Sequence, residues 1–221
     1  TVRWVDMNKG DGETPNYRSR LVAREIRKKG EAPVFDPTPP FESLRAVITD
    51  DPERRQISAV VISRAYFCAD ADPERPTYVA LPPEHGQHGP RKCAILLKHM
   101  CGTKNAADGW HCEYAGLLTG ELGFSVGLAS SCTFFHQEKR LRCSVYGDDF
   151  ATSGPKPALD WFVAELRKRY ELTESARLGP GHTDDKEAKV LNRVVRWTAD
   201  GIEYEADPRP VSYTHLTLPT N

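Results

Sequence analysis

The chain lacks the features of membrane, secreted and zinc-ribbon proteins. No apolar run in its 221 residues approaches the roughly 18–20 residues that a membrane-spanning helix requires. No signal-peptide pattern opens the chain. Six cysteines are present, but they form no Cys-x-x-Cys pair, which disfavours a zinc ribbon. We therefore expect reduced thiols in an intracellular compartment and no membrane partner.

The chain also has little net charge. Lys and Arg total 30 against 31 acidic residues, for a net charge of −1 and a pI of about 6.6. Nucleic-acid binders are often more basic, so the global charge argues against that partner. Residues 1–30, however, hold eight Lys or Arg against four acids. Such a patch suits a site that grips phosphates beside bound cations, although a solvated surface would look the same.

Composition sets broad limits on the fold. A hydrophobic content of 39% is enough for a core, and 16 glycines with 17 prolines indicate many loops. The length fits one large domain or one with subdomains. The chain begins at Thr1 rather than at methionine, so we expect a fragment of a longer reading frame. His85 and His88 with Cys93 could clamp a metal, but their Gly- and Pro-rich setting favours an exposed loop.

Residues 145–150, Val-Tyr-Gly-Asp-Asp-Phe, form the most informative motif. Apolar runs on both sides predict two strands joined by a tight turn at Gly147, Asp148 and Asp149. That hairpin would present both carboxylates at its tip, where they suit Mg²⁺, which binds oxygen ligands together with substrate phosphates. Two such ions could align a 3′-hydroxyl with the α-phosphate of an incoming nucleotide, as in a template-directed polymerase. A solvated turn is the alternative interpretation.

Neighbouring segments, taken in chain order, resemble the reverse transcriptase region of copia-type LTR retrotransposons. The resemblance runs from about Arg3 to about Pro210, and it rests on the collinear order of motifs that are individually modest. The matching segments are the basic segment 16–24, the proline-rich segment 35–40 with Leu44 and Arg45, Tyr78 and Val79 with residues 81–83, the segment 101–110, residues 122–124, Phe134 with Phe135, and residues 146–149.

This resemblance implies a function and a set of site residues. The function is RNA-directed DNA polymerisation by two-metal nucleotidyl transfer, with Mg²⁺ or Mn²⁺ as cofactor. The partners are an RNA template, a DNA primer and deoxynucleoside triphosphates, in a cytoplasmic particle or the nucleus; the oligomeric state stays open. Asp148 and Asp149 would be the catalytic metal ligands. Candidates for nucleotide or template binding are Tyr66, Arg18, Arg20, Arg24 and Lys104.

One departure from the family pattern bears on catalysis. The first catalytic motif of the family has an aspartate five residues before an aromatic residue that excludes a ribose 2′-hydroxyl. Tyr66 fits the aromatic position, but Val61 occupies the aspartate position. Asp70 and Asp72 follow in an expected turn and could replace that aspartate only after a large backbone change.

Valine supplies neither a ligand nor a negative charge, and losing one transition-state-stabilising group commonly costs about 10²–10³ in rate. We therefore expect the chain to polymerise poorly or not at all. A catalytically decayed remnant that retains at most nucleic-acid binding is the second hypothesis. An unrelated domain with a fortuitous Asp-Asp turn is the third, and the collinear motifs disfavour it.

The apolar pattern predicts helices mixed irregularly with strands, which indicates the α+β class. A ferredoxin-like palm fits the order, and the resemblance implies a right-hand polymerase fold with palm, fingers and a truncated thumb. Residues 1–210 would form this reverse transcriptase domain, up to the start of thumb or connection. Residues 211–221 look like a translated sequencing adapter, so we expect them to be a non-native tail outside the domain. The expected elements are helices over 41–49, 103–122 with Thr103 as N-cap and 157–170, strands over 57–67, 132–135 and 141–146, and a hairpin at Asp200 and Gly201.

Overall fold

The structure is a computed structural model that describes residues 2–10, 13–25, 38–48, 56–89, 92–191 and 193–206. The chain divides into two compact units. Unit 1 comprises Thr1–Pro37 and Arg64–Glu121, and unit 2 comprises Thr38–Ser63 and Leu122–Asn221. The adapter-like tail expected over 211–221 lies outside the described residues.

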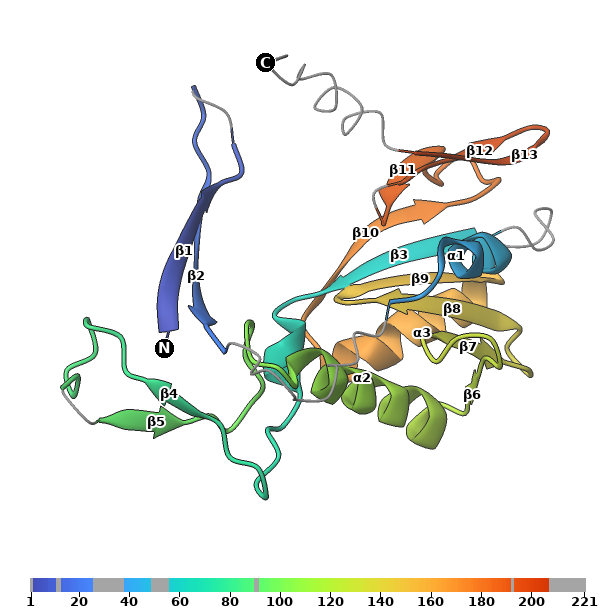
Figure 1. Cartoon of the computed structure of the whole chain (residues 1–221). Coiled ribbons are helices and arrows are strands. Elements are labelled where there is room, and N and C mark those ends of the chain that lie inside the picture. Colours follow the sequence, from blue (N-terminus) through green and yellow to red (C-terminus); the bar gives the residue numbers. More distant parts are fainter. Residues whose placement is uncertain are drawn as a thin grey trace, which may run out of the picture. The chain divides into compact units, whose positions relative to one another are not determined.

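Unit 2 is built on a six-stranded sheet in the order β10-β3-β9-β8-β7-β6 (Figure 1). All neighbouring strands pair antiparallel. With α3 (Lys156–Arg169) between β9 and β10, the order β10-β3-β9-β8 is that of a ferredoxin-like β-α-β-β-α-β unit. The strands are β3 (Gln56–Ile62), β6 (Ser125–Val126), β7 (Thr133–His136), β8 (Leu141–Tyr146), β9 (Asp149–Gly154) and β10 (Leu172–Leu178).

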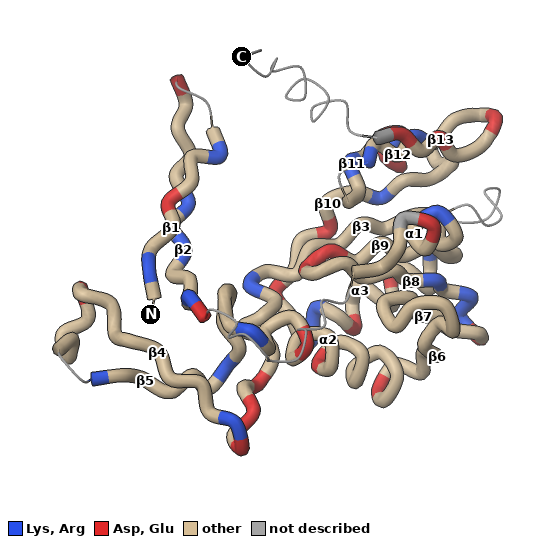
Figure 2. Tube along the Cα trace, viewed as in Figure 1, with Lys and Arg blue, Asp and Glu red and all other residues tan. Residues whose placement is uncertain are grey.

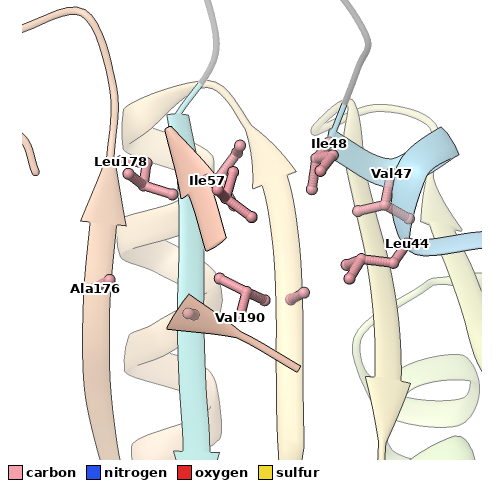
Figure 3. Packing of buried hydrophobic residues seen from close by; sticks show 10 residues of the cluster. Leu44, Val47, Ile48, Ile57, Ala176, Leu178 and Val190 are labelled. Carbon is pink, nitrogen blue, oxygen red and sulfur yellow. The ribbon is translucent and has the colours of Figure 1, made fainter. Parts of the chain in front are cut away.

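Helices cover both faces of this sheet. Helix α1 (Phe41–Ile48) packs on β8 and β9, whereas α3 packs on β3, β9 and β10 from the other side (Figure 1). Side chains of α1 join alternate positions of the central strands in one buried cluster, which Figure 3 shows from close by. Its members are Leu44, Val47, Ile48, Ile57, Ala59, Ala151, Ala176, Leu178, Val190 and Val195.

A second sheet of unit 2 packs against the same cluster through Val190 and Val195. It has the order β11-β12-β13, with β11 (Glu187–Val190), β12 (Arg193–Thr198) and β13 (Gly201–Ala206). Thr198 pairs with Gly201 across a two-residue turn. The hairpin predicted at this position is therefore confirmed.

Unit 1 contains two small sheets and one longer helix. Strands β1 (Val2–Asn8) and β2 (Tyr17–Ala23) form one antiparallel hairpin, and β4 (Tyr78–Ala80) pairs with β5 (Cys93–Ile95). Helix α2 (Ala106–Gly116) continues into a π-helical turn, Leu117–Glu121. A small core links these parts through Ala23, Val79 and Met100.

Two predicted boundaries were wrong. The strand expected over 57–67 ends at Ile62, because Arg64 adopts a left-handed φ of 54° and a 3₁₀ turn, Ala65–Cys68, follows. Thr103 is not the N-cap of α2, because its hydroxyl donates to the Met100 carbonyl and the helix begins at Ala106.

The sequence predicts no membrane-spanning helix and reduced cysteines, and the described ranges give an observation on each. None of their helices combines the length and the apolar character needed to cross a bilayer. The six cysteines all fall within these ranges and form no disulfide.

Candidate catalytic site

The Asp-Asp motif lies on a two-residue hairpin between β8 and β9, where Tyr146 pairs with Asp149. Gly147 has a φ of 59°, and glycine at the first central position is typical of a type II′ turn. Val145 and Phe150 are buried on either side and anchor the turn in the sheet. The motif thus forms the predicted hairpin, with Asp148 in the turn and Asp149 as the first residue of β9.

Asp149 lies in a cross-strand row on one face of the sheet. It pairs with Tyr146 on β8 and with Val61 on β3, and Val61 pairs in turn with Thr173 on β10. Residues directly opposite each other in antiparallel strands share a face, with Cβ atoms about 4.5–5.5 Å apart. The side chain at position 61 is therefore the nearest β3 neighbour of the Asp149 carboxylate.

Two further observations define this corner of the sheet. The Ile62 N–H donates to the Asp148 carbonyl at 2.8 Å, which fixes the turn against β3. Val61 is half-buried, whereas every other residue of β3 is buried. The row thus reaches solvent at position 61, next to the two aspartates.

The two aspartates differ in environment. Asp148 is exposed, and Asp149 is half-buried. Burial, and after it the negative charge of Asp148, together raise the pKa of Asp149 from its usual 3.8 to about 6. Carboxylate pairs with a raised pKa are found more often at functional sites than elsewhere.

Replacing Asp149 by asparagine should stabilise the ion-free chain more at about pH 8 than at about pH 5. The folded pKa of about 6 exceeds the usual 3.8. The folded state therefore binds this proton more tightly, and the cost of the charged aspartate grows as pH rises from 4 to 6. Because partial exposure screens the charge, we expect a gain of about 1 kcal/mol. Urea unfolding in EDTA measures it, and an equal change at both pH values would contradict the assignment.

The donor set fits one hard divalent cation better than two. Asp148 and Asp149 offer the one or two carboxylates through which Mg²⁺ usually binds beside substrate phosphates. In the part of the chain that the structure describes, no group of three or more His, Cys, Asp or Glu side chains is placed to hold a metal ion. Val61, which pairs with Asp149, supplies no metal ligand. His88 Nδ1 lies 2.8 Å from the Leu81 carbonyl, in keeping with the exposed loop expected there.

The other predicted site residues belong to unit 1. Tyr66 is half-buried in the 3₁₀ turn. Arg18 and Arg20 are two residues apart on β2, and β2 pairs with β1 so that Met7 opposes Arg18 and Val5 opposes Arg20. Lys104 Nζ lies 3.8 Å from the Glu25 carboxylate, and the Lys104 N–H donates to the same carboxylate at 2.8 Å.

The β1–β2 register reveals an arginine that sequence reasoning did not select. Arg3 opposes Val22, which lies on the same face of the hairpin as Arg20 and Arg18. Exposed arginines thus share one face of β1 and β2, and Figure 2 shows basic segments along both strands. Arg24 lies beyond β2. The period-two alternation within residues 17–23 is a sequence signal that places Arg18 and Arg20 on one face. Only the pairing of β2 with β1 adds Arg3 to that face.

Comparisons with known proteins support the fold. No protein-family model and no curated protein matches the chain. Among solved structures, the chain is similar to a foamy viral protease-reverse transcriptase in complex with double-stranded DNA, with a TM-score of 0.51 and 14% sequence identity. The match covers 99% of this chain and 33% of the viral one, so this chain spans about a third of that length. The chain therefore has a mixed helix and strand fold similar to that of a reverse transcriptase.

Proposed function

We propose that this chain is a reverse transcriptase domain of copia-type retroelement lineage that polymerises poorly because position 61 lacks a carboxylate. The observation that carries the proposal is the in-register pairing of Val61 with Asp149, beside Asp148. Fold similarity to a reverse transcriptase over 99% of the chain supports it, and so does the collinear order of the motifs. In this proposal the six-stranded sheet of unit 2 is the palm, and unit 1 supplies the fingers.

The residues of the chain have distinct roles in this proposal. Asp148 and Asp149 would hold Mg²⁺ or Mn²⁺, which supplies Lewis-acid stabilisation of phosphate charge and a more nucleophilic 3′-hydroxyl. The exposed arginines of the β1–β2 hairpin neutralise phosphates of template or triphosphate. Tyr66 limits the sugar to a deoxyribose. Val61 presents methyl groups beside Asp149, so one transition-state charge contact is lost.

A second candidate function is a decayed remnant that binds nucleic acid without polymerising. The same valine favours it, because an exposed arginine face can bind phosphates without any carboxylate at the β8–β9 turn. Both functions share the fold and the basic hairpin. They differ in whether a carboxylate at position 61 brings catalysis back.

RNA-templated primer extension in Mg²⁺ by the unchanged chain and by Val61→Asp tests the proposal. We expect slow extension or none from the unchanged chain and a clear gain from the variant. A second readout, Mn²⁺ binding followed by electron paramagnetic resonance, needs no turnover. Strong extension by the unchanged chain would contradict the impaired-site proposal, and unchanged Mn²⁺ binding in Val61→Asp would remove position 61 from the metal site.

A further inference from the structure

Strands β4 and β5 of unit 1 form a two-stranded sheet (Figure 1), and its two faces lie in different environments. On the inner face, Val79 is buried in the small core of unit 1, and Ala94 and Leu96 pack against that core. Alternate positions point away from the core, and there Tyr78 pairs with Ile95. This outer surface, the β4–β5 face, comprises Tyr78, Ala80, Cys93, Ile95 and Leu97, all of them exposed.

The β4–β5 face is apolar and uncharged. Tyr78 is 63% exposed, Ile95 50% and Leu97 76%. Neither strand contains a charged residue, and Figure 2 shows both strands without acidic or basic segments. The exposed apolar area is roughly 400 Å², a size at which such patches commonly mark protein interaction sites. Because this is about half of the ~800 Å² per partner in a standard interface, a complex formed through this face should be weak and concentration-dependent.

Charged residues at the two ends of the β4–β5 face complement each other. Lys92 is exposed and directly precedes β5 at one end. At the Leu97 end, Asp70 bridges to Lys98 and pairs with its Nζ at 2.7 Å, which neutralises that lysine. Asp72, two residues further on, is 48% exposed and has a weak ion-pair contact of 4.0 Å. One end therefore offers a cation and the other an available carboxylate.

We propose that the β4–β5 face binds the same face of a second copy of this chain, with the strands of the two copies antiparallel. A two-fold axis near Ile95 then places Tyr78 and Ile95 of both copies at the centre of the contact. Two copies meet without burying like charges, and each Lys92 approaches Asp72 of the other copy. A parallel arrangement would instead bring the two Lys92 side chains together, which costs free energy. The proposal does not depend on the polymerase function.

Sedimentation equilibrium of the full chain tests the dimer, in buffer with EDTA and a reductant and without nucleic acid. We expect a monomer at low micromolar concentration and a growing dimer fraction at hundreds of micromolar. Ile95→Glu should raise the dissociation constant at least about tenfold, because the two-fold axis brings two carboxylates into an apolar contact. Leu128→Glu is the matched control, since it adds the same charge at a fully exposed leucine of unit 2 and should leave the constant unchanged. Circular dichroism shows that each variant is folded.

A cross-linking experiment with Leu97→Cys tests the antiparallel alignment. Cys93 and position 97 are roughly 13 Å apart along an extended chain, too far for a disulfide within one copy. In the antiparallel dimer, Cys93 meets position 97 of the other copy, so mild oxidation should produce a covalent dimer. Adding Cys93→Ser should prevent this cross-link. The exposed Cys112 is replaced by serine in every protein compared.

Each outcome supports or overturns the proposal. Concentration-dependent dimers that Ile95→Glu weakens, together with a cross-link that needs both Cys93 and Leu97→Cys, support it. A monomer at every concentration overturns it, and so does a dimer that Ile95→Glu leaves intact. A covalent dimer that forms equally well without Leu97→Cys contradicts the antiparallel alignment and with it the proposal. No readout involves primer extension or a metal ion, so a failure here is distinct from a failure of the proposed polymerase function.

Discussion

Replacing Val61 by aspartate is expected to raise the rate of RNA-templated primer extension by about 10²–10³, the size typical of one restored transition-state contact. Val61 pairs in register with Asp149 on β9, next to Asp148. A carboxylate at position 61 would therefore lie within about 4.5–5.5 Å of Asp149, measured between Cβ atoms, and would complete a set of three acids. Steady-state extension of a labelled DNA primer in Mg²⁺ measures the gain.

Control variants separate charge from shape at this position. Val61→Asn has nearly the size of aspartate and can offer an amide oxygen, but it carries no charge, so its gain should be far smaller. Val61→Asp combined with Asp149→Asn should lose the gain, because the new acid works with the existing pair. Equal rates for Val61→Asp and Val61→Asn would show that charge at position 61 is irrelevant to the reaction.

Metal affinity provides a measurement that does not need a complete polymerase. Because Asp148 and Asp149 offer two carboxylates, the unchanged chain should bind Mn²⁺ weakly, and Val61→Asp should bind it at least about tenfold more tightly. The affinity should also fall as pH drops through about 6, since Asp149 is protonated below its raised pKa. Tighter metal binding without any gain in extension would favour the decayed-remnant function.

Local sequence signals predicted the β8–β9 hairpin, which carries Asp148 and Asp149, more accurately than they predicted the neighbouring strand β3. Apolar runs around Gly147 indicated two strands and a tight turn, and the structure contains both. The same reasoning extended β3 to residue 67, because the aromatic residues after Ile62 continue an apolar run. The strand stops earlier because Arg64 takes a left-handed φ, which no residue-type signal reveals.

Pairing register was beyond the reach of local patterns. The resemblance assigned position 61 to a missing acid, but only the β3–β9 pairing places that position opposite Asp149. Strand β10 was not predicted because four of its seven residues are polar. Glu174 and Arg177 of β10 are partly buried and form an ion pair with each other. Because charged residues occupy these partly buried positions, the strand does not show the apolar alternation that marks half-buried strands.

This Glu174–Arg177 pair leads to the second large expected effect, a loss of about 2–4 kcal/mol of stability in Arg177→Ala. Arg177 Nε and the buried Ser58 hydroxyl both donate to the same Glu174 oxygen at 2.6 Å, and Arg177 Nη2 lies 3.3 Å from Asp160 on α3. The side chains of Arg177 and Glu174 are only 19% and 21% exposed. Removing the arginine alone leaves the Glu174 carboxylate poorly solvated and without its cation, at the edge where β10 pairs with β3.

A double-mutant comparison tests whether the loss comes from the Glu174 charge left without its partner or from lost packing. Arg177→Met with Glu174→Met removes both charges and keeps similar volume, so its stability should lie within about 1 kcal/mol of the unchanged chain. Arg196→Ala, which breaks the pairing of Arg196 on β12 with the exposed carboxylates of Glu187 and Glu205, should shift urea unfolding far less than Arg177→Ala. A loss in the double variant as large as in Arg177→Ala would assign the effect to packing. Because β10 supports the strand that carries Val61, that result would also mean that the candidate site is held by shape and not by this polar network.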